Sequence, residues 1–159
     1  MTGEKHTERE SLLAELRAIL NAGSERGLAL QAATDALRRA GGYCWVGLYD
    51  VDHARGEVRN IVYSGAGAPE FPTFPITKGL TGSAISGGKT VNVGDVAADP
   101  RYLTAFGNTR SEIIVPIFDR GHRRGVGTID VESEVSHAFD ERTQGILEAC
   151  AETLAPLWH

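Results

Sequence analysis

Residues 111–133 read SEIIVPIFDRGHRRGVGTIDVES, two apolar stretches on either side of a basic turn. The stretches, residues 112–118 and 125–132, are rich in valine and isoleucine, which favours β-strands. Glycine and charged residues between them predict the turn of an antiparallel hairpin. Side chains alternate across a strand, so Asp130 and Glu132 share one face of the predicted sheet.

A second hairpin is expected earlier in the chain. Residues 43–51 (YCWVGLYDV) predict a strand, residues 52–56 a turn and residues 57–64 (EVRNIVYS) the partner strand. Trp45 and Tyr49 lie on the same face of the first of these strands. A short helix and a short strand are expected at residues 80–86 and 89–93, followed by a long loop at residues 95–110. Loops of that length are uncommon unless they are functional.

Helical patterns occupy both ends of the chain. Thr7 and Glu10 have the spacing of a capping box, with Thr7 as the N-cap of a first helix, and a second helix is expected at about residues 25–40. Asp140 is expected to cap the last helix. Terminal helices around hairpin-linked strands predict an α+β fold. We expect an antiparallel sheet of five or six strands with the N- and C-terminal helices packed on one face.

The length of 159 residues predicts a single domain over residues 1–159, with helices in 1–42 and the sheet, pocket loops and last helix in 43–159. The net charge of −5 argues against nucleic acid or an anionic membrane surface as a partner. No apolar run is long enough to span a bilayer, and the charged N-terminus does not resemble a secretory signal. We therefore expect a cytoplasmic protein.

Three carboxylates stand out because they lie in otherwise apolar strands: Glu112, Asp130 and Glu132. A buried carboxylate is costly unless it is paired, so each of them needs a partner if it is buried. Their spacing alone favours the alternative, strand ends that face water. Common enzyme motifs are absent, and neither the five histidines nor the two cysteines have metal-ligand spacing, so we expect no metal and no cofactor.

From Tyr43 to its end, the chain resembles a GAF domain, a small-ligand sensory fold of signalling proteins with a PAS-like antiparallel sheet. The likeness is carried by five stretches: WVGLYD, ITKGLTGSAISGGKTVNVGDVAADPRY, SEIIVPI, GVGTIDVES and FDERTQGILEACAETL. Among GAF domains, it most resembles the free-methionine-(R)-sulfoxide reductases, which are single domains preceded by helices.

This resemblance implies a binding pocket. Trp45 and Tyr49 match an aromatic pair that surrounds the methylsulfinyl end of the substrate in that family. Glu112 matches the glutamate of the family's SEIVVPL motif, and Asp130 and Glu132 match the acidic pair of its LDIDS motif. These carboxylates bind the amino group of the substrate and assist the chemistry. The resemblance thus implies that all five residues face one ligand.

The catalytic cysteines of that family are missing. Their positions correspond to Phe71, Thr81 and a residue near Ala105. The family's reaction needs a thiol that forms a sulfenic acid and a second thiol that resolves it, and threonine supplies neither. Cys44 and Cys150 fall on faces that predict core thiols.

Three functions remain open from the sequence. The first is a GAF sensor for a small amine or amino acid, with a pocket of six residues: Trp45, Tyr49, Thr81, Glu112, Asp130 and Glu132. A phosphate, as in a cyclic nucleotide, would be repelled by these acids. The second is a divergent reductase, and the third is a dimerisation module with an empty pocket. The expected partners are a small molecule and a second copy of the chain, as a homodimer.

Overall fold

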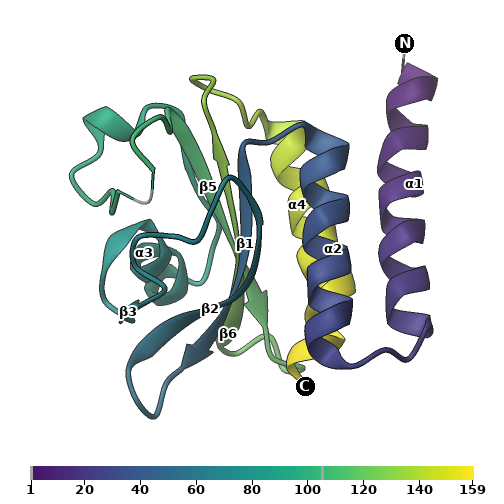
Figure 1. Cartoon of the computed structure of the whole chain (residues 1–159), viewed down its shortest axis with the longest axis horizontal. Helices are drawn as coiled ribbons and strands as arrows, with labels where there is room; N and C mark the ends of the chain where they lie inside the picture. Colours follow the sequence, from purple (N-terminus) through teal and green to yellow (C-terminus); the bar gives the residue numbers. More distant parts are fainter. Residues whose placement is uncertain (1, 105) are drawn as a thin grey trace.

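A six-stranded antiparallel sheet runs through the middle of the molecule (Figure 1). The structure is a computed structural model that describes residues 2–104 and 106–159. The strand order is β3-β2-β1-β6-β5-β4, so the two predicted hairpins are joined where β1 pairs with β6. The strands are β1 (Trp45–Asp52), β2 (Glu57–Gly65), β3 (Thr73–Pro75), β4 (Val91–Val93), β5 (Ser111–Phe118) and β6 (Gly125–Ser133).

Three helices cover one face of this sheet. They are α1 (Thr2–Asn21), α2 (Arg26–Gly41) and α4 (Glu141–Leu154), which a 3₁₀ turn η2 (Ala155–Trp158) follows. Helices α2 and α4 lie against the strands, and α1 packs on α2 and α4 as an outer layer (Figure 1). The predicted α+β architecture, with both ends of the chain on one face, is confirmed. No described helix is long and apolar enough to cross a membrane.

The main hydrophobic core lies between the sheet and these helices. Alternate residues of the central strands, among them Val46, Ile129 and Val131, are fully buried there against helix leucines such as Leu30 and Leu147. This burial follows from the alternation of the strands and the apolar stripes of the helices.

Two predicted helix caps had different outcomes. Asp140 caps α4 as expected, because its carboxylate accepts a hydrogen bond of 2.8 Å from the Thr143 N–H. The prediction for Thr7 was wrong, since α1 already begins at Thr2. The Thr7 hydroxyl instead donates to the carbonyl of Gly3, one turn earlier. A threonine that bonds back in this way fits inside a helix, so the capping-box spacing did not mark its start.

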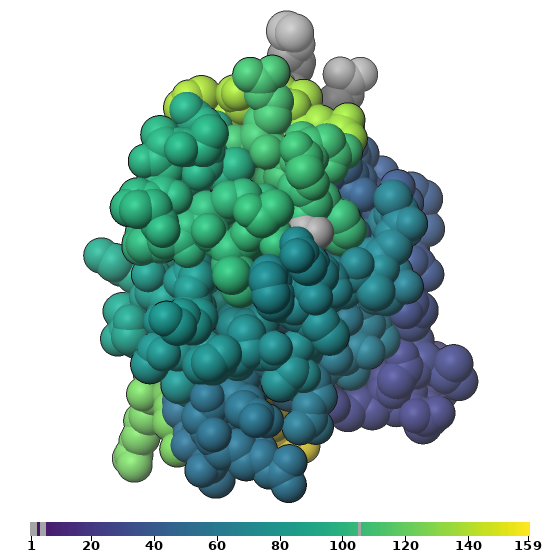
Figure 2. Space-filling view, turned by 60° about the vertical axis from the view of Figure 1, so that its left-hand side comes forward, coloured from purple at the N-terminus to yellow at the C-terminus, as the bar shows by residue number. Residues whose placement is uncertain are grey.

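The opposite face of the sheet is covered by α3 (Gly79–Gly87), a 3₁₀ turn η1 (Val96–Ala98) and the loops around them. In the space-filling view, the teal and green atoms of these segments meet over this face (Figure 2). Gly79 starts α3 with a φ of +71°, a conformation that glycine adopts without strain. A Cβ at this position would also lie 3.3 Å from Cβ of Leu103, so the helix and the loop approach closely here.

Candidate functional site

A cavity of about 30 Å³ lies between the sheet and α3. We call it the carboxylate cavity. Water-sized cavities need roughly 10–15 Å³ per molecule, so it has room for about two waters. All six residues predicted to bind a ligand line it: Trp45, Tyr49, Thr81, Glu112, Asp130 and Glu132. The remaining walls are Pro69, Phe71, Phe74, Gly79, Leu80 and Leu103.

Strand register brings the three acids together. Glu112 of β5 lies directly opposite Glu132 of β6, and Asp130 is two residues before Glu132 on the same face. Directly opposed side chains in an antiparallel pair have Cβ atoms about 4.5–5.5 Å apart, and like charges at that distance repel. All three residues are buried. The sequence alternative, strand ends that face water, is therefore wrong.

The hydrogen bonds of the acids are uneven. Asp130 accepts one from the hydroxyl of Thr128 at 2.7 Å and one from that of Thr81 at 3.2 Å. Glu132 accepts a long one of 3.4 Å from the Tyr102 hydroxyl at Oε1. Its other oxygen, Oε2, is buried and has no hydrogen-bond partner among the described residues. The hydroxyl of Thr109 lowers the pKa of Glu132 but does not reach hydrogen-bond geometry.

Burial dominates the electrostatics of the cavity. It raises the pKa of Asp130 to about 7, against two hydroxyl bonds that lower it. Burial and the nearby Asp130 raise the pKa of Glu132 to about 7, and burial with both neighbouring acids raises that of Glu112 well above its usual range. No arginine or lysine in the described part of the chain forms an ion pair with any of the three. The cavity therefore holds protons near neutral pH that a bound cation would displace.

Aromatic rings form the wall beside the acids. The indole of Trp45 lies over Gly47, where a Cβ would come within 2.6 Å of ring atom Cζ3, and its N–H donates to the carbonyl of Gly67 at 3.0 Å. The rings of Trp45 and Tyr49 are 6.5 Å apart. Burial raises the pKa of Tyr49, so its hydroxyl stays neutral. This wall suits an apolar or sulfur-bearing group next to a cation.

The first turn of α3 forms another wall, through Gly79, Leu80 and Thr81. The first N–H to bond back within this turn is that of Gly82, which donates to the carbonyl of Lys78. The three N–H groups before it have no partner within the helix, and Lys78 supplies no side-chain cap. A helix N-terminus favours an anion. One side of the cavity thus suits a cation and another side an anion.

A GAF domain family model matches residues 25–156. This chain belongs to the GAF domain family. It is 31% identical to the free methionine-R-sulfoxide reductase of Neisseria meningitidis, solved in complex with its substrate. That alignment covers 94% of this chain and 87% of the other, with a TM-score of 0.86.

Two curated relatives are matched over 110 residues, or 69% of this GAF chain. It is 32% identical to the protein YtsP of Bacillus subtilis and 31% identical to the free methionine-R-sulfoxide reductase of Saccharomyces cerevisiae. The matched regions are 65% and 60% of those proteins, so this chain spans less than two thirds of their length.

The positions that the family resemblance assigns to the reductase cysteines hold other side chains in this chain. Thr81 and Phe71 both line the carboxylate cavity, and Phe71 is 41% exposed at its outer edge. Ala105 lies outside the described residues. Neither Cys44 nor Cys150 lines this cavity.

The two cysteines differ from each other. Cys150 is a core thiol as predicted, and burial raises its pKa to about 12. The same prediction for Cys44 was wrong, because Cys44 is only half-buried. It lies just before the first residue of the central strand β1, and its thiol donates to the carbonyl of Glu132 at 3.0 Å. Burial raises the pKa of Cys44 too, so neither thiol is favoured as a thiolate.

Sequence reasoning missed several residues of the site. Leu103 lines the cavity and Tyr102 donates to Glu132, and both belong to the loop at residues 95–110. The unusual length of this loop was the sequence feature that pointed to a functional role. Thr128, which donates to Asp130, could have been found by strand alternation, because it lies two residues before Asp130 on the same face.

Proposed function

We propose that this GAF domain is a sensory module that binds a small amine in the carboxylate cavity, most simply a free amino acid such as methionine or its sulfoxide. The observation that carries the proposal is the oxygen Oε2 of Glu132, which is buried beside two other carboxyl groups and has no hydrogen-bond partner in the described chain. A buried acceptor of this kind needs a donor, and an ammonium group supplies donors together with the compensating charge.

The other walls favour an amino acid over a simple amine. Three N–H groups at the start of α3 suit a carboxylate, while Trp45 and Tyr49 suit a sulfur-bearing or apolar side chain. A cyclic nucleotide would bring its phosphate close to the three acids, without an arginine or lysine in the cavity wall to neutralise it.

A ligand of this size requires the cavity to open. Methionine is several times larger than about two water molecules, so binding has to part the loops that carry Phe71 and Leu103. These loops belong to the teal and green part of the surface in the space-filling view (Figure 2). If these loops move when the ligand binds, the outer surface of the domain differs between the free and bound states. A partner protein could then distinguish the two states, as a sensory role requires.

Reductase activity is the second candidate, and the similarity to the Neisseria enzyme favours it. Reduction of a sulfoxide through sulfenic acid and disulfide requires two thiols at the site. Thr81 and Phe71 supply none, and the chain has only two cysteines, both outside the cavity wall. We therefore expect no turnover of methionine-(R)-sulfoxide in an NADPH-coupled thioredoxin assay. Turnover that Cys44→Ala abolishes would support the reductase instead.

Calorimetric titration tests the binding proposal. We expect methionine or its sulfoxide to bind, and N-acetylmethionine and cyclic nucleotides not to bind, because they lack the ammonium group. Glu132→Gln should weaken binding by about tenfold or more, since a hydrogen bond to a charged partner is lost. The matched control is Glu134→Gln, an exposed acid two residues further on. Cyclic-nucleotide binding that Glu132→Gln leaves unchanged would overturn the proposal.

A further inference from the structure

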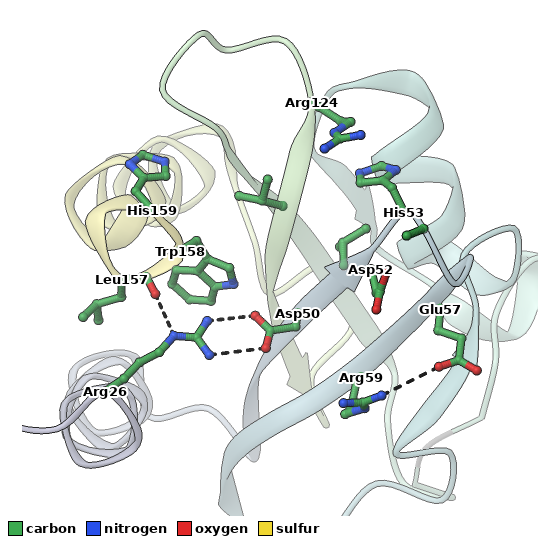
Figure 3. A pocket seen from close by; sticks show the side chains of 13 residues that line it. Arg26, Asp50, Asp52, His53, Glu57, Arg59, Arg124, Leu157, Trp158 and His159 are labelled. Carbon is green, nitrogen blue, oxygen red and sulfur yellow. Dashed lines mark hydrogen bonds and ion pairs between the residues drawn. The ribbon is translucent and has the colours of Figure 1, made fainter.

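A second depression opens where β1 ends and β6 begins, and we call it the hairpin groove (Figure 3). Its volume is about 810 Å³, within the range of small-molecule sites. It shares no described lining residue with the carboxylate cavity. Its walls come from the β1–β2 hairpin, the start of β6 with the turn before it, α2 and η2, and include Arg26, Asp52, His53, Arg59, Arg124 and Trp158.

One wall of the groove is fixed in place. The guanidinium of Arg26 lies over the indole of Trp158, with Cζ 5.4 Å from the ring centroid. Arg26 also donates to the Asp50 carboxylate at 2.8 Å and to the Leu157 carbonyl at 2.7 Å. The indole rests on the backbone of β6, since a Cβ at Gly127 would come within 2.6 Å of its Cε2 atom. The charge of Asp50 is therefore neutralised, and Trp158 is held in one orientation.

The acidic side chains of the groove all have arginine partners. They pair as Asp50 with Arg26, Asp52 with Arg55 and Glu57 with Arg59. Arg124 differs from these arginines, because no carboxylate in the described ranges forms an ion pair with it. Its charge contributes to lowering the pKa of Asp119, but only from a distance. Three arginines and three acids thus line the groove, and Arg124 is the arginine among them without an ion pair in the described ranges.

His53 lies next to this cation. Its Nε2 is 2.7 Å from the carbonyl of Gly125, the residue after Arg124. A carbonyl only accepts, so Nε2 carries the hydrogen in this bond. Figure 3 shows Arg124 and His53 at the same rim of the groove, across from Trp158. The basic turn at residues 120–124 adjoins this rim, in a chain whose net charge is −5.

We propose that the hairpin groove binds a small organic molecule with one anionic head group, a carboxylate or a phosphate ester, next to an apolar body. The guanidinium of Arg124 holds the head group. Trp158 and Val126 contact the apolar body. The ligand proposed for the carboxylate cavity is recognised by its ammonium group, whereas the ligand of the hairpin groove is recognised by its anionic group.

The two tryptophans of the chain allow a direct test, because one lies in each site. Their indole N–H signals are followed by ¹H–¹⁵N NMR of the full chain during titration with benzoate, phenyl phosphate, inorganic phosphate and neutral benzamide. We expect benzoate or phenyl phosphate to shift the Trp158 signal to saturation and to leave the Trp45 signal in place. Whichever of benzoate and phenyl phosphate binds more tightly identifies the preferred head group. Neutral benzamide should shift the Trp158 signal only slightly.

Two arginines of the same turn make a matched pair of variants. Arg124→Gln should weaken binding by about tenfold, as for the loss of a charge-assisted hydrogen bond. Arg123 is not part of the groove wall, so Arg123→Gln should leave the affinity unchanged. Arg124→Lys keeps the charge and should retain part of the affinity. The proposal is overturned if no anion moves the Trp158 signal, if Trp45 moves instead, or if both glutamine variants weaken binding equally.

Discussion

The two faces of the central sheet carry side chains of opposite character, although alternate residues of the same strands form them. On β6, Ile129 and Val131 point into the helix-covered core, whereas Asp130 and Glu132 point into the carboxylate cavity. All four are buried. Burial stabilises the first pair and raises the pKa of the second, at a cost in stability. Ionisable groups with strongly shifted pKa values are typical of functional sites.

The largest expected effect is on the helix-covered face. Ile129→Ala should lower the free energy of unfolding by about 2–5 kcal/mol, because it leaves a cavity in a fully buried position. Urea denaturation measures the loss. Val135→Ala, at a position 65% exposed, should change stability by less than about 0.5 kcal/mol. Equal effects of the two variants would contradict the assignment of the core to this face.

The second prediction concerns pH and the opposite face. Asp130 and Glu132 have folded pKa values of about 7, above their ordinary values near 4. Between about pH 4 and pH 7 the folded state therefore binds more protons than the unfolded state. The free energy of unfolding falls as the pH rises through this range. Asp130→Asn removes one such group. Relative to the natural chain, this variant should gain about 1–3 kcal/mol between pH 5 and pH 8.

Asp119→Asn is the control for this pH dependence. A hydrogen bond from the backbone N–H of Arg123 lowers the pKa of Asp119, so this carboxyl is ionised in both states from pH 5 to pH 8. The stability difference between Asp119→Asn and the natural chain should therefore be flat over that range. A flat difference for Asp130→Asn as well would show that its carboxyl does not titrate there.

The smallest effect is expected from one hydroxyl group. Thr128→Val removes the 2.7 Å hydrogen bond to Asp130 and keeps the shape of the side chain. A hydrogen bond of about 0.5–1.5 kcal/mol corresponds to a rise in the pKa of Asp130 of about half to one unit. NMR titration of the side-chain carboxyl carbon measures it. Thr153→Val on α4, far from the cavity, should leave that pKa in place, and a shift there would point to a general loosening.

Much of this contrast between faces could be predicted from the sequence. The alternation of apolar and acidic residues at 129–132 set the face of each side chain, and Asp140 marked the start of α4. These features are local, so spacing alone is enough to find them. The likeness to the GAF family added that Glu112, Asp130 and Glu132 share one pocket.

Other features depend on tertiary contacts that spacing does not encode. The cavity volume is set by how closely Leu103 and α3 approach, and Tyr102 reaches Glu132 across 30 residues of sequence. Cys44 had the alternation of a core residue, but it lies just before β1 begins and is only half-buried. The homodimer stays a prediction that sedimentation or size-exclusion measurements can test. A second copy would not pack on the faces of α2 and α4 that α1 covers.

The most direct test of the central claim is the number of protons released when methionine binds at pH 7. It is measured by calorimetry in buffers of different ionisation enthalpy. An ammonium group placed among carboxyls that are partly protonated at this pH should ionise them. We predict a release of about 0.5–1 proton per ligand, reduced in Asp130→Asn. Binding heats that are the same in all buffers, or proton uptake, would contradict the account.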